Sequence, residues 1–504
     1  MIARTPATGP SALDARLLAL SSSLALDLPL LTEDIVGSVA HTIGLYQVGL
    51  LRADEAEMLR AGLLELLDQV RAGQAQLPPE EDVHMAVEAA LTQRLGAVAG
   101  RLHTGRSRND QIALDIALHL RETARCVGGW LARLLETLCE LAQDNAEVLL
   151  PGYTHRQRAI PITVGHWAAA GAAALLRDAR QLTFLLGELD RCPLGAGALA
   201  ASSLPLDRGA VASLLGFASP TLNSLDTVGD RDGIVGLAYL SARIHVHTSR
   251  LAADVVDYAS QEFGFVRLDD AIAGGSSMMP HKKNPDVFEL VRGRSARAIG
   301  DLVAALTLTR GLPLGYQRDL QEDRALLTGL GPHLCGTLEL LDLGLRHLRF
   351  DAEAMSEALA RDCTQATDLA EVLVQAGVPF RRAYQSIGAL VAAARARGHG
   401  LQMLGAEDLR AVIPAECGGD ERLVARLLER LDPAACVSAR TLPGGPAPEA
   451  VRQQVAELRT GVAALLQRLE QVPALSELEQ RLRRYPLVLR EGHTPAPTGP
   501  GDAA

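Results

Sequence analysis

The stretch of sequence that decides the fold is residues 110–145, DQIALDIALHLRETARCVGGWLARLLETLCELAQDN. Its apolar residues follow the spacing of one helical face and lie at positions 112, 116, 120, 127, 131, 134, 138 and 141. At about 1.5 Å per residue, a single helix over this stretch would be roughly 50 Å long. A helix of that length is longer than a globular domain normally needs and is typical of a rod in a helical bundle.

Three more long helices are predicted, near 162–190, 233–263 and 286–311. We expect the last of them to begin with Asn284 as its N-cap, Pro285 at the first helical position and Asp286 at the positive end of the helix dipole. Strand patterns are few, because no stretch alternates apolar and polar residues between Asn-Gly or Asp-Gly turns. The sequence therefore predicts a mainly α fold with a central bundle of long helices.

Breaks in the helical pattern suggest how the chain is divided. Glycine and proline residues interrupt it at 73–79, before the long helices, and again after them, at 377–379, 414 and 444–448. We expect an N-terminal helical domain over 1–105, the central bundle over 106–350 and a C-terminal helical domain over 351–490. The Pro- and Gly-rich ending, 491–504, is predicted to be a disordered tail.

The composition excludes several classes of protein. Of the 504 residues, 48% are hydrophobic and only 3% are aromatic, which fits an aliphatic helical core and argues against wholesale disorder. The formal net charge of −11 argues against a nucleic acid or an anionic membrane as the main partner. The seven cysteines form no C-x-x-C pair, so neither a zinc ribbon nor a disulfide framework is expected.

The sequence also shows neither a signal peptide nor a membrane-spanning segment, and this predicts the location of the protein. Residues 1–15 lack an apolar signal core, and no apolar run is long enough to span a membrane. We therefore expect a soluble protein of the reducing cytoplasm. No metal or organic cofactor is expected, because the sequence contains neither a metal-ligand spacing nor a phosphate-binding loop.

The segment most informative about chemistry is 274–285, GGSSMMPHKKNP. A glycine pair, two hydroxyl groups and two ammonium groups just before a helix suit a mobile lid that binds an anion. Lys282 and Lys283 are the only lysines among the 49 basic residues. Because an ammonium is a compact point charge whereas a guanidinium is a wide planar fork, lysine here indicates a geometric demand. Chance placement of two adjacent lysines is the alternative.

Two polar stretches have both a functional and an ordinary interpretation. Residues 102–110, LHTGRSRND, place Arg106 and Arg108 where they can hold carboxylates bidentately. The alternative is a helix-capping turn with solvated arginines. Residues 315–324, GYQRDLQEDR, carry polar or charged groups on every face and would ordinarily form a solvated loop.

A fourth stretch lies between the first two long helices. Residues 151–166 read PGYTHRQRAIPITVGH and place Thr154 and His155 in a turn. A lone histidine in a turn is more often a hydrogen-bonded structural group than a catalyst. The stretch alone therefore leaves its role open.

Together these stretches resemble the argininosuccinate lyase branch of the fumarase/aspartase superfamily, over roughly residues 20 to 460. The motifs that carry the resemblance are, in chain order, SSSLALD, GSVAH, EDVH, HTGRSRNDQ, PGYTHRQRA, PLGAGALA, NSLDTVGDRD, GSSMMPHKKNPD, YQRDLQED and GVPFRRAY. The pattern GSS-x-MP-x-K-x-NP marks the superfamily, and GRSRNDQ with GYTH-x-QRA narrows it to this branch. The resemblance implies the three-domain superfamily fold, a tetramer and chemistry without a cofactor.

The resemblance also implies a reaction, the elimination of fumarate from an N-substituted aspartate. The main catalytic task is then to stabilise the aci-carboxylate dianion that forms when the Cβ proton leaves. Ser276 corresponds to the base of the family, and Lys282 and Asn284 correspond to its partners on the same loop. His155 corresponds to the histidine across the site, with Glu289 as its charge partner.

Further positions correspond to the substrate-binding residues of the family. They would hold the carboxylates and the amino-acid end of a small dicarboxylate substrate, and they are Ser23, Asp27, Ser107, Arg108, Asn109, Thr154, Ser277, Tyr316, Gln321 and Arg324. In family members each site gathers residues from three subunits of a homotetramer. The resemblance therefore predicts that an isolated protomer is inactive.

The sequence departs from the branch at several places. Arg324 stands where argininosuccinate lyases usually have lysine, and His281 stands where they have glutamine, as in adenylosuccinate lyases. Val87 replaces the asparagine expected shortly after EDVH, and Ile160 replaces the glutamine expected before Pro161. The usual Trp-Gly-Gly-Arg-Phe opening is absent. These changes make the pocket lining less polar and bear on the substrate rather than on the chemistry.

Three hypotheses follow. The first is cleavage of argininosuccinate to arginine and fumarate, because GRSRNDQ, GYTH and YQRDLQED all occur in order. The second keeps the reaction but changes the amine, for example to a diamine N-succinate, nitrosuccinate or another N-succinyl compound. The third is a helical structural protein without turnover, as among lens crystallins of this family. Retention of the five catalytic correspondences argues against the third.

Overall fold

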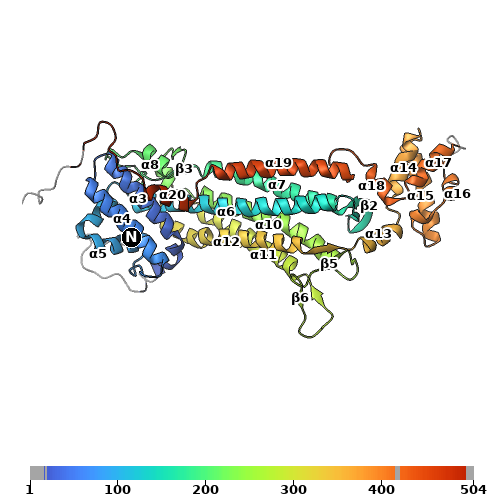
Figure 1. Ribbon diagram of the computed structural model, residues 1–504, viewed down its shortest axis with the longest axis horizontal. Helices are drawn as coiled ribbons and strands as arrows, with labels where there is room; N and C mark the ends of the chain where they lie inside the picture. The colour runs from blue at the N-terminus through green and yellow to red at the C-terminus, as the bar shows by residue number, and fades with distance from the viewer. Residues whose placement is uncertain (1–15, 17–19, 415–419, 495, 497–504) are drawn as a thin grey trace, which may run out of the picture.

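The computed structural model describes residues 16, 20–414, 420–494 and 496. Long helices lie side by side in the middle of an elongated molecule, with smaller helical units at each end (Figure 1). The long helices are α6 (Arg108–Asp144), α7 (Val164–Glu188), α10 (Asp232–Tyr258), α11 (Asp286–Thr309), α12 (Asp323–Arg346) and α19 (Pro448–Glu470). The prediction of a mainly α fold with a central bundle of long helices is confirmed.

Helix α6 is the longest element of the bundle among the described residues, at 37 residues. A capping box begins it, in which the Ser107 backbone N–H donates to Asp110 Oδ1 at 2.9 Å and the Asn109 N–H donates to Ser107 Oγ at 3.3 Å. Its apolar face, which includes the fully buried Leu131 and Leu138, packs against α7, α12 and α19. The apolar spacing read from the sequence is therefore the face that the bundle buries.

Three hydrophobic clusters hold the molecule together, and they do not follow chain order. The first is the bundle itself. The second joins α3 (Leu31–Gln47), α4 (Ala53–Arg71), α5 (Val83–Leu95), α8 (Arg208–Leu214) and α20 (Leu475–Arg483) at one end. The third lies at the other end and joins α14 (Ala366–Gln375), α15 (Phe380–Ala396), α16 (Ala406–Arg410) and α17 (Glu421–Glu429).

The predicted C-terminal domain thus contains helices that pack elsewhere. Helix α19 lies in the central bundle against α6 and α7, and α20 packs on the N-terminal cluster through Leu475, Leu478 and Leu482. Between the bundle and the third cluster lie α13 (Ala352–Ala360) and α18 (Pro433–Ser438). The boundaries at 105, 350 and 490 stay predictions, and most of the predicted tail lies outside the described residues.

The strands are short and occur in pairs. The longest pair is an antiparallel hairpin of β1 (Leu149–Thr154) and β2 (Gln157–Thr163), which replaces the simple turn expected between the first two long helices. The others are β3 (Arg191–Cys192) with β4 (Ser219–Pro220), β5 (Val266–Leu268) with β8 (Leu348–Phe350), and β6 (Gly274–Gly275) with β7 (Lys283–Asn284). Two of these hairpins carry predicted site residues.

The start of α11 differs from the prediction. Asn284 is not its N-cap, because it pairs with Gly274 in the β6–β7 hairpin. Pro285 takes the N-cap position, and the first helical residue is Asp286. At this point the β6–β7 strand pairing outweighs the preference of asparagine for the N-cap position. Across the described residues, no helix combines the length and the apolar character that crossing a membrane requires.

Gly165 allows the hairpin to join the bundle. It is the second residue of α7, and its N–H donates to the carbonyl of Asn145 at the end of α6, at 2.9 Å. A Cβ atom at 165 would lie 2.5 Å from the carbonyl oxygen of Ala142 and 2.7 Å from the Cα of Ala146. Only glycine therefore permits this approach of the two helices at the base of the hairpin.

Gly165→Ala is expected to lower the free energy of unfolding by ~1–3 kcal/mol, because the clash is with backbone atoms that cannot rotate away. Gly187→Ala on the same helix is the control, since nothing lies within 4 Å of a Cβ there. That variant should be neutral or up to about 1 kcal/mol more stable. Urea denaturation measures both, and equal effects of the two changes would contradict the packing argument.

Candidate active site

A small cleft lies where the N-terminal cluster meets the start of the bundle. Its volume is about 60 Å³. Elements α2 (Leu24–Asp27), the first turn of α6, the 3-10 turn η4 (Arg318–Glu322) and the first turn of α12 surround it. Seven residues predicted to bind substrate line this cleft, namely Ser23, Asp27, Arg108, Asn109, Tyr316, Gln321 and Arg324.

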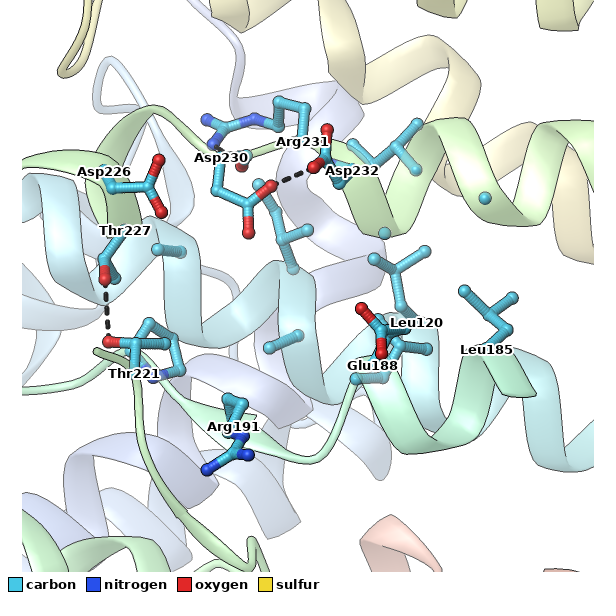
Figure 2. Close-up of a pocket in the computed structure, with 18 of the residues that line it drawn as sticks. Leu120, Leu185, Glu188, Arg191, Thr221, Asp226, Thr227, Asp230, Arg231 and Asp232 are labelled. Atoms are coloured by element: carbon cyan, nitrogen blue, oxygen red, sulfur yellow. Dashed lines mark hydrogen bonds between the residues drawn. The ribbon is translucent and has the colours of Figure 1, made fainter. Parts of the chain in front are cut away.

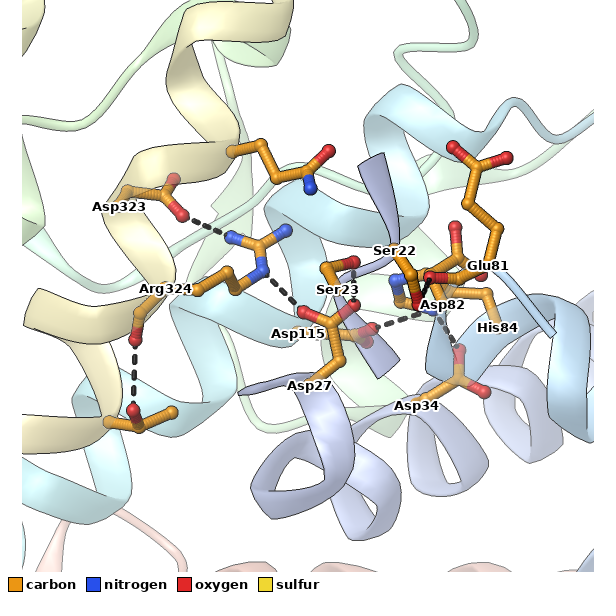
Figure 3. Close-up of polar contacts among 12 residues, drawn as sticks. Ser22, Ser23, Asp27, Asp34, Glu81, Asp82, His84, Asp115, Asp323 and Arg324 are labelled. Atoms are coloured by element: carbon orange, nitrogen blue, oxygen red, sulfur yellow. Dashed lines mark hydrogen bonds and ion pairs between the residues drawn. The ribbon is translucent and has the colours of Figure 1, made fainter. Parts of the chain in front are cut away.

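Arg324 is the most buried cation of the cleft, with 3% of its surface exposed. Its Nε lies 2.7 Å from Asp27 Oδ1, and its Nη1 donates to Asp323 (Figure 3). Burial alone would lower the pKa of Arg324, but the adjacent carboxylates of Asp323 and Asp27 raise it above its usual value. The guanidinium is therefore a fixed positive charge, already neutralised by the protein.

Arg108 has a similar arrangement at the start of α6. It is buried, and its Nη1 donates to Asp82. Asp82 is the N-cap of α5, where it also accepts from the backbone N–H of Met85 at 2.8 Å. Asp82 was not among the predicted site residues, although the EDVH motif that contains it was recognised. Its contact with Arg108 spans 26 residues of sequence, which local patterns do not reveal.

Hydrogen bonds from η4 hold the segment that precedes α2 at the cleft. The Gln321 side-chain amide donates to the carbonyl of Ser21 at 3.0 Å, and Arg318 Nη2 donates to the same carbonyl at 2.9 Å. Arg318 also forms an ion pair of 2.7 Å with Glu81. These contacts explain why the stretch expected as a solvated loop is partly buried. Arg318 and Glu81 are lining residues that the sequence analysis did not single out.

Two predicted binding residues have other partners in the chain. Ser107 caps α6, as described above. Asn109 donates from its side-chain amide to the carbonyl of Ala198 at 3.0 Å. Burial raises the pKa of the Tyr316 phenol, so this group remains a neutral hydrogen-bond donor at the cleft.

The loop that carries Ser276 lies well away from this cleft. Its flanks pair as β6 and β7, and the loop projects from the side of the bundle (Figure 1). Ser276 Oγ accepts from the backbone N–H groups of Met279 at 2.9 Å and Met278 at 3.3 Å. Ser277 and Lys282 are exposed. Two N–H dipoles directed at one oxygen favour negative charge on that oxygen.

The tip of the β1–β2 hairpin carries a second group of predicted site residues that do not line the cleft. Thr154 and His155 are exposed there. His155 and Arg156 have φ values of 53° and 58°, which non-glycine residues adopt rarely and mostly at tight turns. At this tip Arg156 pairs with Asp257 of α10 at 2.9 Å, while the His155 side chain is exposed. Strained conformations of this kind cluster at functional sites.

Glu289, the expected partner of His155, does not contact it within a single chain. Glu289 lies on the exposed face of α11, and its Oε1 is 3.6 Å from Arg292 Nη2. No contact joins His155 to Glu289 among the described residues of a single chain. The structure therefore gathers seven of the ten predicted binding residues in one cleft but does not bring the loop and the hairpin to it.

A buried cluster next to the cleft has the residue types of a metal site. One donor atom each of Asp34, His84 and Asp115 lies within 4.8 Å of the others. The guanidinium of Arg106 belongs to the same cluster, and Asp34 already accepts from Gln111. Burial raises the pKa of Asp115 well above its usual value, so it is a poor anionic ligand. The Arg106 guanidinium, which already interacts with Asp34 and Asp115, disfavours a second cation at this place.

A wider groove of about 600 Å³ lies along α6 (Figure 2). Its floor is apolar, with Ala113, Ile116 and Leu120 among its residues, and carboxylates such as Asp230 border it. Arg231 lines the groove and pairs with Asp323, which also holds Arg324. A shared carboxylate therefore connects groove and cleft.

Comparison with known proteins identifies relatives over most of the chain. Residues 10–300 match the family model described as "Lyase", and residues 363–438 match the model described as "Argininosuccinate lyase C-terminal". The argininosuccinate lyase of Moorella thermoacetica is 42% identical over 445 residues, which are 88% of this chain and 94% of that protein. The enzyme of the same name from Desulforudis audaxviator is 44% identical over 87% of this chain and 94% of its own length.

Solved structures agree with this result. An EDDS lyase in complex with formate is 26% identical, has a TM-score of 0.77 and covers 91% of this chain and 94% of its own. A class II fumarase from Schistosoma mansoni, at 18% identity and a TM-score of 0.66, covers 79% of this chain and 93% of its own. The second likeness concerns the fold alone.

Arg324→Met is expected to lower the free energy of unfolding by ~3–5 kcal/mol, because it leaves the buried carboxylate of Asp27 without its cation and that of Asp323 with Arg231 alone. Arg324→Lys should lose less, since an ammonium keeps the charge but cannot span both carboxylates as a fork does. Urea denaturation measures both changes.

Arg318→Met is the matched control, since it breaks an ion pair whose arginine side chain is 45% exposed. It should cost ~0–1 kcal/mol. If Arg324→Met cost no more than Arg318→Met, the assignment of Arg324 as a buried structural charge would be wrong.

Proposed function

The chain belongs to the argininosuccinate lyase family, and we propose that it is the carbon–nitrogen lyase that splits argininosuccinate into arginine and fumarate by β-elimination. The observation that carries this proposal is the convergence of seven family-type binding residues, from three separate stretches of sequence, in one cleft. Two buried arginines beside hydroxyl and amide groups suit a substrate that carries several carboxylates.

In the proposed mechanism, Ser276 removes the Cβ proton of the aspartate part of the substrate. A serine hydroxyl is a weak base unless its alkoxide is stabilised. The two backbone N–H groups that already donate to Ser276 Oγ provide such stabilisation. Lys282 adds positive charge on the same loop. The departing amine then leaves as the Cα–N bond breaks and fumarate forms.

Fixed positive charge is needed where the proton leaves, because the intermediate carries a doubly charged aci-carboxylate. Arg108 and Lys282 are proposed to face this charge from the cleft and from the loop, and Asn284 to hold the loop closed over it. His155 is proposed to tune proton transfer, with Glu289 as its partner. Both lie outside the cleft in one chain.

We propose that the missing groups come from other copies of the chain, in a homotetramer with shared sites. Arg108 begins α6 and the hairpin follows its end, so the 37 residues of α6 separate them by ~55 Å. No loop motion within a chain closes such a gap. The bundle also exposes large apolar side chains on α11, where Leu290, Ile299, Val303 and Leu306 are 46–58% exposed, as expected of a face that another subunit covers.

The likeness to EDDS lyases favours a second candidate, the same elimination from a different N-substituted aspartate. Val87 is buried on α5 and Ile160 is half-buried on β2. Both are apolar where polar residues were expected, and an apolar lining discriminates poorly between leaving groups of similar size.

The function is tested by the absorbance of fumarate released from a panel of N-substituted aspartates. Argininosuccinate is expected to give the highest kcat/KM, at least ~10-fold above a diamine N-succinate, because hydrogen-bonded groups reject analogues that leave them unpaired. A folded, oligomeric protein that releases no fumarate from argininosuccinate would contradict the first candidate. A higher rate with another member of the panel would support the second.

Shared sites are tested by mixing inactive chains. Ser276→Ala removes the proposed base and Arg108→Ala removes a binding cation, so each variant alone should be slower by at least ~10²-fold. When both are co-expressed, about a quarter of the sites in a random mixture should receive one intact copy of each group from two chains. Fumarate release by the purified mixture measures the recovery.

The matched control is co-expression of Ser276→Ala with Lys282→Ala. Both changes lie on one loop, so no mixture restores an intact loop and no activity should return. Recovery in this control, or none in the first mixture, would argue against sites shared between subunits.

A further inference from the structure

A buried polar cluster behind the cleft is not used by the mechanism above. Asp34 on α3, His84 on α5 and Asp115 on α6 are each at most 3% exposed. His84 Nδ1 lies 3.0 Å from Asp34 Oδ1 and 3.3 Å from Asp115 Oδ2 (Figure 3). Two carboxyl groups thus face one imidazole nitrogen at the junction of three helices.

Several atoms of this cluster lack hydrogen-bond partners in the described part of the chain. They are Asp34 Oδ2, His84 Nε2 and both oxygens of Asp115. The apolar Val87 lines a cavity of about 10 Å³ beside Asp34 and His84 and offers no partner. Since each unpaired buried polar group costs roughly 1–3 kcal/mol, stability alone does not account for the cluster.

The two carboxyl groups are not equivalent. His84 Nδ1 carries at most one proton and is nearer to Asp34, which also accepts from the Gln111 amide. Burial raises the pKa of Asp115 well above its usual value, and the charges of Asp34 and Glu33 raise it further, against Arg106 and Arg324. For Asp34, burial opposes ionisation, but His84, Arg106 and Gln111 bring its pKa below the usual value.

The cluster is joined to the cleft along one face of α6. Arg108, Gln111 and Asp115 are spaced by three and four residues, so they share that face. They contact, in order, Asp82, Asp34 and His84. Since Asp82 caps the helix in which His84 is the second residue, the position of His84 sets where Asp82 meets Arg108.

We propose that Asp34, His84 and Asp115 form a positioning cluster for the substrate-binding Arg108, in which Asp34 carries the negative charge and Asp115 carries the proton. The inference rests on the proposed function. Asp34 anchors His84, His84 fixes the start of α5, and Asp82 at that start holds the guanidinium of Arg108 at the cleft. A neutral Asp115 packs against the imidazole without drawing it from Asp34.

The two assignments are tested by the same substitution at the two carboxyl groups. Asp34→Asn removes the charge that anchors His84, and it should raise the KM for argininosuccinate at least 10-fold and lower kcat as well, because Arg108 also faces the charge of the intermediate. Asp115→Asn resembles the protonated acid and should leave KM within twofold of the wild type. Asp115→Ala, which removes the packing as well, should raise KM.

Asp178→Asn is the matched control. Asp178 is also fully buried and pairs with a histidine, His247 Nδ1 at 2.6 Å, but it lies between α7 and α10 in the bundle and lines no part of the cleft. Its loss should lower the melting temperature without changing KM. Melting temperature and oligomeric state are measured for every variant.

Each outcome decides a separate point. An Asp34→Asn chain with the KM of Asp178→Asn at a similar loss of stability would overturn the positioning role. Equal KM increases for Asp34→Asn and Asp115→Asn would overturn the charge assignment. A wild-type chain that releases no fumarate from argininosuccinate contradicts the proposed function instead, and then fumarate binding by calorimetry replaces KM as the readout for the cluster.

Discussion

The length of α6 is the constraint on which the rest of the structure depends. A helix of 37 residues is stable in water only when its apolar face is covered along its whole length, and α7, α12 and α19 provide that cover. The bundle is therefore long, and Arg108 lies at one end of it and the His155 hairpin at the other. A site that needs both ends has to be assembled from more than one chain. Under the proposed function, catalysis then depends on assembly rather than on the fold of a protomer.

Because two arginines of the cleft are buried, each needs a carboxylate of the protein beside it. Arg108 and Arg324 are both buried, and each already has a carboxylate of the protein, Asp82 for the first and Asp27 with Asp323 for the second. Unpaired, such cations would destabilise the fold by several kcal/mol. A substrate carboxylate therefore has to share an arginine with a carboxylate of the protein, which restricts binding to ligands that satisfy several donors at once.

The sequence allowed the regular parts of this structure to be predicted and left the long-range parts open. The long helices follow from apolar spacing, which is local, and the grouping of Ser23, Asn109 and Gln321 follows from the family motifs. Other features depend on which distant segments meet. Helix α19 enters the bundle across more than 300 residues from α6, and Asp34, His84 and Asp115 come together from three helices. Asn284 shows the same effect, because pairing with Gly274 overrides its capping preference.

The difference between local and long-range contacts also distinguishes the residues proposed for proton removal from those proposed for substrate specificity. The contacts that stabilise charge on Ser276 Oγ come from the residues two and three positions later, so the loop carries them wherever it is placed. Substrate binding, as proposed, instead depends on contacts between distant segments, such as Arg324 with Asp27. Of the departures from the family pattern, Arg324 belongs to that second group, whereas Val87 lies beside Asp34 and His84 and Ile160 lies in the β1–β2 hairpin. Under the proposed function, a change in that second group alters which amine fits while the Ser276 loop keeps its local geometry, so that one elimination reaction can serve different N-substituted aspartates.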